Sequence, residues 1–187
     1  MKLLALTCPD CTEHLSPGND DLVTLCPRCQ RSYYLDDRGL MSIKIQFALA
    51  GKQAPNDSWV PFWLFNGKVT LRERQTQGGG SSSGRAAEEL WSQTRQFYIP
   101  AWDLPLEQAK GIGARLVESQ PQLQLIEQPE QVKLIPAILP PDGALKMIDF
   151  IVLTIEARRK DWLKKLDFHV QADKPRLFAL PAQQIGR

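Results

Sequence analysis

The sequence predicts an α+β protein with a small cysteine-containing module at the N-terminus, followed by a mainly antiparallel β domain with a few short helices. All four cysteines lie between residues 8 and 29 of the 187-residue chain. From residue 41 onward, short segments alternate apolar and polar residues, as half-buried strands do. Apolar residues at helical spacing follow only in a few places, the clearest being Leu106, Ala109, Ile112 and Leu116.

Glycine, proline and small polar residues cluster at 51–58 and indicate a boundary between two parts. We therefore expect a module with its following strand at residues 1–50 and an α+β domain at residues 59–187. Residues 75–87 contain GGGSSSG and few apolar side chains. Such a segment buries too little apolar surface to offset its ordering, so we predict a flexible surface insert there.

The formal net charge of +2 is small for a dedicated nucleic-acid-binding protein. No run of eighteen apolar residues occurs, and the first residues carry too short an apolar stretch for a secretory signal. The sequence thus predicts a cytoplasmic protein without a transmembrane segment. In a reducing compartment, paired thiols favour metal binding over disulfides.

The four cysteines follow the pattern C-x2-C-x14-C-x2-C, as Cys8, Cys11, Cys26 and Cys29. Two residues between thiols allow a tight turn with converging sulfurs, and a proline follows the first cysteine of each pair. Two such turns complete a tetrahedron of thiolates, which suits a structural Zn²⁺ ion and leaves no position for water.

The CPDC and CPRC pairs resemble the zinc ribbon, over residues 3–47, and more weakly the rubredoxin knuckle, which holds iron. The resemblance implies a structural zinc ion, with iron as a minor alternative, and a small β-sheet that contacts a protein or nucleic acid. Both families often place glycine after the second cysteine of a knuckle, where Thr12 and Gln30 stand here. We expect this departure to remove a left-handed backbone position and to weaken the case for iron.

The side chains of residues 1–35 sum to a charge of −1, and coordination of Zn²⁺ by four thiolates makes this sum more negative by two. Nucleic-acid affinity comes mainly from neutralising phosphates. A ribbon with this charge is therefore expected to repel a phosphate backbone.

Several strands are predicted beyond the cysteines. Residues 41–47 alternate apolar and polar side chains and form one strand, paired with residues 33–35 through the turn DDRG at 36–39. Asn66-Gly67 predicts a tight hairpin turn between two arms of residues 59–74. Further strands are predicted at 150–157 and 166–170, and an edge strand at 177–180, with a short helix at 144–148.

Three segments centred on Pro61, Pro100 and Pro136 resemble one another. Because proline lacks a ladder donor, each is predicted at a strand entry, a bulge or an edge. A duplicated β unit and a coincidence among common strand residues both remain open.

The sequence indicates no enzyme. It contains no phosphate-binding loop, no GxSxG and no HExxH, and GIGAR at 111–115 lies within a predicted helix. His14 and His169 are both expected as exposed side chains. The spacing of Asp149, Glu156 and Asp161 brings no two of these acids together.

The segment RRKDWLKK supplies the other candidate site. It is interpreted either as a turn between two strands with its tryptophan packed inward, or as a surface that contacts an anionic protein, a membrane surface or RNA. The candidate partner-binding residues are Arg158, Arg159, Lys160, Trp162, Lys164 and Lys165.

The favoured function is therefore a non-catalytic zinc-binding adaptor or subunit that contacts a protein partner. An RNA- or DNA-binding accessory factor that uses residues 158–165 is the alternative. The oligomeric state and the pathway stay open.

Overall fold

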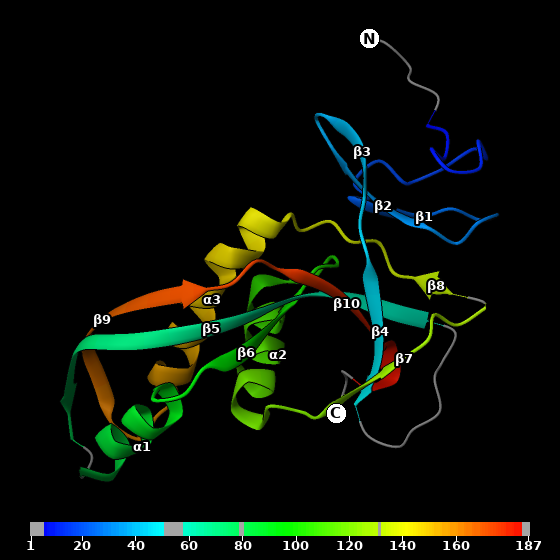
Figure 1. The fold of residues 1–187 in the computed structure, drawn as a ribbon. Coiled ribbons are helices and arrows are strands. Elements are labelled where there is room, and N and C mark those ends of the chain that lie inside the picture. Colours follow the sequence, from blue (N-terminus) through cyan, green and yellow to red (C-terminus); the bar gives the residue numbers. More distant parts are fainter. Residues whose placement is uncertain (1–5, 51–57, 79–80, 131, 185–187) are drawn as a thin grey trace.

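The computed structural model describes residues 6–50, 58–78, 81–130 and 132–184. It has an α+β fold, as predicted, with mostly antiparallel strands and three α-helices in the described residues. Figure 1 shows the cysteine-containing module at one end and the long strand β5 extending away from it. None of the described helices combines the length and the apolar character needed to span a bilayer.

The module contains a three-stranded antiparallel sheet in the order β1-β2-β3. Asp37 and Arg38 form the turn between the last two strands, and this confirms the hairpin predicted around DDRG. The bounds are Val23–Leu25 for β1, Ser32–Asp36 for β2 and Gly39–Ser42 for β3.

A larger sheet has the order β6-β5-β10-β4-β7, and β8 and β9 pair with other parts of β5. β10 pairs in parallel with β4 and antiparallel with β5. The bounds are Ile45–Ala50 for β4, Ser58–Gln77 for β5, Arg95–Pro100 for β6, Leu123–Ile126 for β7, Lys133–Leu134 for β8, Trp162–Ala172 for β9 and Arg176–Pro181 for β10.

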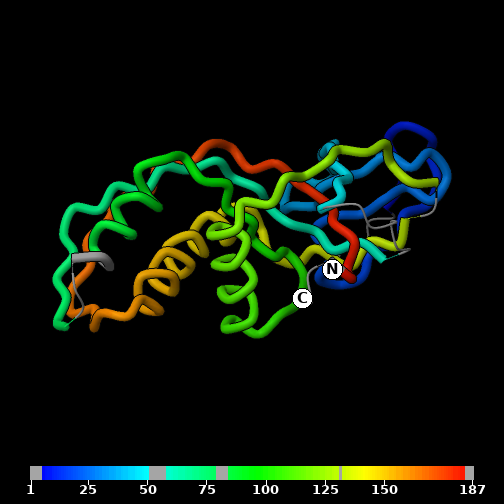
Figure 2. The backbone as a smooth tube through the Cα atoms, turned by 90° about the horizontal axis from the view of Figure 1, so that it is seen from below, coloured from blue at the N-terminus to red at the C-terminus, as the bar shows by residue number. Residues whose placement is uncertain are grey.

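The helices are α1 (Ser81–Trp91), α2 (Leu106–Ser119) and α3 (Pro141–Ala157), and a 3₁₀ turn follows at Ala182–Gln184. In Figure 2, α2 and α3 lie on the same side of the arc formed by β5. The two helices meet at Gly113, where an added Cβ would lie 2.3 Å from Cδ1 of Ile151. Glycine permits this close approach, because any other residue at position 113 would force the Ile151 side chain to move.

The predicted hairpin at Asn66-Gly67 is wrong, because β5 continues through both residues. Neither residue has the positive φ that a type I′ turn requires. β10 pairs with residues 59–64 of β5 and β9 with residues 67–77, so β5 finds partners along its length. Gly67 lies close to the ring of Phe97, so that an added Cβ would meet the ring at 3.0 Å and the ring would have to shift slightly.

Residues 150–157, predicted as a strand, form the second half of α3. The helix extends well beyond the predicted 144–148 because Ile148, Ile151, Val152 and Ile155 share one buried face at helical spacing. Residues 41–47, predicted as one strand, are divided between β3 and β4, which belong to different sheets. The predicted edge strand at 177–180 lies inside the sheet, between β4 and β5. The helix predicted from Leu106 is confirmed by α2.

The segment near 75–87 also differs from the prediction of an insert without regular structure. Residues 75–77 belong to β5, and residues 81–87 to α1. The helix is amphipathic, since Ala87 and Trp91 are buried and Leu90 packs against the same core. Residues 79–80 lie outside the described part.

Pro61 lies within the central strand β5, which contradicts its predicted place at a strand entry, a bulge or an edge. It pairs with Ala179 of β10, and its carbonyl accepts a hydrogen bond from the Ala101 N–H at 3.0 Å. Pro100 ends β6, and Pro136 follows β8. The three prolines thus hold different places in the fold.

Most of the predicted boundary at 51–58 lies outside the described residues, and the domain limits stay a prediction. The strand that precedes the boundary, β4, pairs with β10 and β7 of the larger sheet. The module also packs on that sheet: Tyr34 meets Trp63 edge to face at 6.2 Å between ring centroids. The N–H of Leu22 donates to the carbonyl of Ala137 at 2.7 Å. One side of the module therefore packs into the core of the larger sheet, while the cysteines lie in a small core of their own.

A buried ionic cluster joins three distant parts of the chain. Arg74 of β5 bonds Glu156 at 2.8 Å and Asp161 at 2.7 Å, and all three side chains are almost fully buried. Glu156 also accepts from Arg159 and from Nε1 of Trp91, each at 2.8 Å. The sequence-based view that no two acids converge is wrong for Glu156 and Asp161, because Arg74 lies more than eighty residues away in the chain.

This cluster predicts a pH-dependent effect of Arg74→Met. Hydrogen bonds from Arg74 lower the pKa of Asp161 despite its burial. A carboxyl with a lowered folded-state pKa stabilises the protein above its unfolded pKa of about 4, and this contribution is lost as pH falls through the folded-state pKa. Arg74→Met leaves the buried Asp161 without a cation and Glu156 with Arg159 alone, so we expect a loss of about 3–5 kcal/mol at pH 7.

The loss should be smaller at pH 3, because protonation of the carboxyls begins to remove both the wild-type ion pairs and the unpaired charge in the variant. Urea unfolding at both pH values measures it, with Arg72→Met, an exposed arginine of the same strand, as the control. An equal loss for Arg74→Met at both pH values would contradict the role assigned to the ion pairs.

Candidate metal centre

The two cysteine turns have the same backbone geometry. The carbonyl of Cys8 accepts from the N–H of Thr12 at 2.9 Å, and that of Cys26 accepts from Gln30 at 3.0 Å. Thr12 and Gln30 have φ values of 62° and 59°. The expectation that the left-handed position is lost without glycine is therefore wrong, because the turn imposes it on other residues. Thr12 and Gln30 therefore provide no argument against iron.

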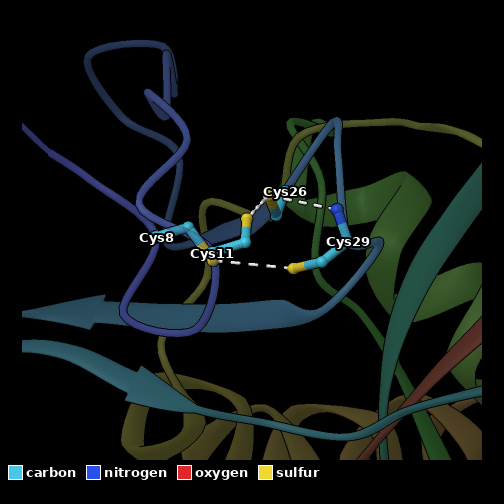
Figure 3. Close-up of side chains that lie close together, drawn as sticks. All are labelled: Cys8, Cys11, Cys26 and Cys29. Carbon is cyan, nitrogen blue, oxygen red and sulfur yellow. Dashed lines mark hydrogen bonds between the residues drawn. The ribbon is translucent and has the colours of Figure 1, made fainter.

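All four sulfurs converge on one point, as Figure 3 shows. The four Sγ atoms lie within 4.8 Å of one another. Cys8 Sγ is 3.6 Å from Cys29 Sγ, and Cys11 Sγ is 3.4 Å from Cys26 Sγ. These separations are far longer than a disulfide bond of about 2.05 Å. A tetrahedral ion with metal–sulfur bonds of about 2.3 Å holds its sulfurs about 3.8 Å apart, so the cysteines fit such an ion.

The electrostatics of the sulfurs also favour a cation. Burial raises the pKa of the Cys8 thiol, but hydrogen bonds from Tyr33 and from the N–H groups of Asp10 and Cys11 outweigh it and lower the pKa to about 6. The N–H of Glu13 lowers the pKa of Cys11, but burial and the neighbouring sulfurs outweigh it and raise the pKa to about 12. One thiolate forms readily, and further negative charge beside it is stabilised by a metal ion.

The centre is enclosed by a very small core. Leu15 and Tyr33 are buried with Cys8 and Cys26, and few other apolar side chains pack against them. His14 is exposed, as predicted, although it lies between the two turns. Such a core is too small to hold the module together by apolar burial alone, so metal bonds are expected to supply much of its stability.

Three polar residues that support the centre were missed in the sequence. The Tyr33 hydroxyl lies between Cys8 Sγ, at 3.1 Å, and the Asp10 carboxylate, and its one proton can be donated to either. Asp10 is also paired with Arg31. Asp10 lies between the first two cysteines and Arg31 two residues beyond the last, so their places near the ligands were the available signal. The chain of contacts ties the first turn to the second.

The basic segment lies at the other end of the molecule, in the turn from α3 to β9 and at the start of β9. Trp162 is 74% exposed, so the prediction that it packs inward is wrong. Arg158, Lys160 and Lys164 are exposed. Arg159 is held by Glu156, and Lys165 pairs with Glu73 at 2.7 Å. Among the described residues, the structure thus leaves the tryptophan and three of the five cations exposed and outside any ion pair, and whether they bind a partner stays a prediction.

His169, also exposed as predicted, lies on β9. Asp149 lies on α3 and lines the same surface cavity as His169.

The comparisons with protein-family models, with curated proteins and with solved structures found no match for this chain. The cysteine cluster resembles a zinc ribbon knuckle in its geometry, and no family is assigned.

Metal analysis tests the centre directly. The purified protein should contain about one metal ion per chain, and Cys26→Ser should lose it, because a serine hydroxyl stays protonated at neutral pH and cannot replace a buried thiolate. Loss of the ion should unfold the module, as shown by the NMR signals of residues 8–36. A variant that keeps both the ion and those signals would contradict the four-sulfur site.

Tyr33→Phe tests the contact to Cys8. Removing a hydrogen-bond partner of a ligand is expected to weaken metal binding by about 10- to 100-fold. A competition titration with a chromogenic chelator measures this, and Tyr34→Phe, the adjacent tyrosine that packs on Trp63, is the matched control. Equal affinities of the two variants would show that the Tyr33 hydroxyl does not support the centre.

Proposed function

We propose that the protein is a non-catalytic zinc-binding adaptor or subunit, in which zinc holds the N-terminal module and the α+β domain contacts a protein partner. The observation that carries this proposal is the closed set of four converging sulfurs. Four thiolates fill a tetrahedral zinc ion and leave no position for substrate or water, so the ion has a structural role.

Two features of the structure support a role in contacting a protein. The module and the sheet share a core through Tyr34 and Trp63, so the ion stabilises the larger domain as well as its own turns. Large apolar side chains are exposed on α3 and at the start of β9. Exposed aromatic residues such as Trp162 are enriched among residues that contribute most to protein interfaces.

Zinc is preferred to iron because two isolated Cys-x2-Cys turns at a ribbon spacing suit a redox-inactive ion. A colourless protein with one zinc ion per chain supports this choice. A visible absorption band from thiolate-to-iron charge transfer would instead show that the bound ion is iron. The structural role of the site would be unchanged.

Binding of RNA or DNA through residues 158–165 is the second candidate. Trp162 is exposed beside Arg158, Lys160 and Lys164, and this arrangement combines a stacking surface with cations. The two remaining cations of the segment are engaged in ion pairs, which reduces the charge available for phosphates. Binding that falls steeply with added salt would favour this candidate.

Purification of the intact protein from its native cells tests the adaptor role. We expect one or more proteins to co-elute at constant stoichiometry through size-exclusion chromatography. Nuclease treatment should leave this complex intact, because its contacts are between proteins. Elution of the chain alone, or loss of the complex after nuclease treatment, would overturn the proposal.

A further inference from the structure

The exposed apolar side chains are concentrated in one place. Among the described residues, the large hydrophobic side chains with the greatest exposure are Leu106, Leu125, Leu145, Phe150, Leu153 and Trp162. Four of these six belong to α3 and β9, which are consecutive in the chain and joined by the turn at residues 158–161. We call residues 141–172 the α3–β9 hairpin.

A cavity of about 470 Å³ lies between the two elements of this hairpin. Its helical wall includes Leu145 and Asp149, and Leu153 continues the same line, because residues four apart share a helix face. The full lining consists of Leu145, Lys146, Asp149, His169, Val170, Gln171 and Ala172.

The opposite wall is the free edge of β9. In the described residues, β9 pairs with β5 alone, from Trp162 to Ala172. An edge strand presents unpaired backbone N–H and C=O groups along its open side. A strand edge beside an apolar helix face is a combination that extended peptides use for binding.

Charge at the turn end of the hairpin, beyond the residues that line the cavity, indicates the chemistry of the occupant. Arg158 and Lys160 are exposed in the turn and Lys164 near the start of β9, and none has an ion-pair partner among the described residues. Asp149 and Lys146 line the cavity itself. The turn therefore attracts acidic residues, while the rest of the groove offers apolar and polar contacts.

We propose that the groove between α3 and the free edge of β9 binds an extended acidic segment of a partner protein as an additional β-strand. This inference rests on the proposed adaptor function and names the surface and the partner chemistry. The added strand hydrogen-bonds to β9, and its alternate side chains face α3, because a strand added to a sheet continues its two faces.

The distance between two exposed leucines of α3 sets the spacing of the apolar residues in the bound segment. Leu145 and Leu153 are eight residues apart, which corresponds to about 12 Å along a helix axis. Two strand residues four positions apart lie on the same face and about 13 Å from each other. The segment thus carries two apolar residues at positions i and i+4, a polar residue at i+2 beside Asp149, and acidic residues at the end near the turn.

A library of random twelve-residue peptides displayed on phage provides a probe that assumes no sequence. Selection on the intact, metal-loaded protein should enrich peptides with apolar residues at i and i+4 followed or preceded by acidic residues. The double variant Leu145→Glu, Leu153→Glu should bind an enriched peptide at least tenfold more weakly. Leu106→Glu, an equally exposed leucine on α2, should bind it as the wild type does.

Two readouts separate strand addition from simple apolar contact. Methylation of alternate backbone nitrogens of the peptide should abolish binding, because it removes the donors to β9. Peptide binding should slow amide hydrogen exchange in β9 and not in β7, an edge strand that carries the exposed Leu125. Thermal melting confirms that the double variant is folded.

The groove proposal is overturned if no peptide is enriched, if enriched peptides bind the double variant equally well, or if the methylated peptide binds unchanged. Binding of a single-stranded RNA or of phosphatidylserine vesicles in place of peptides would also overturn it. If the native complex persists in the double variant, the groove proposal is wrong, but the proposed adaptor function is retained. Loss of the native complex in the double variant alone, with enriched peptides of the expected pattern, would support the proposal.

Discussion

The continuous backbone pairing of β5 is the constraint on which the rest of the fold depends. A twenty-residue strand carries many polar backbone groups, and each must find a partner when it is buried. β10 and β9 supply partners along one edge, one after the other, and β6 pairs with the middle of the other edge. The helices that line the large core and the turn with the exposed cations are positioned by this strand.

The metal centre depends on β5 less directly. Two local turns bring the sulfurs together, and Asp10, Tyr33 and Arg31 hold the turns in place. The small module then rests on Trp63 of β5 through Tyr34. Coordination geometry is thus a property of a few residues close in sequence, whereas the orientation of the centre is set by the large sheet.

The separation in sequence between contacting residues explains which features could be predicted. The cysteine turns, the DDRG hairpin and the helix from Leu106 follow from neighbouring residues, and each was predictable. Asn66-Gly67 failed as a turn signal because strands more than a hundred residues later pair with the flanking segments. Residues 150–157 were mistaken for a strand because a short apolar run fits either period when it is buried. The convergence of Arg74, Glu156 and Asp161 could not be predicted, since it depends on the completed sheet.

The shared core of module and sheet has a consequence for the life of the protein in a cell. A ligand that binds only the folded state shifts the folding equilibrium by mass action. The free energy of unfolding of the whole chain is therefore expected to depend on the free concentration of the ion. If the centre binds its ion as proposed, a newly made chain without the ion would expose the Tyr34–Trp63 contact and become a substrate for quality-control proteases. Cellular abundance is then expected to follow the supply of the ion.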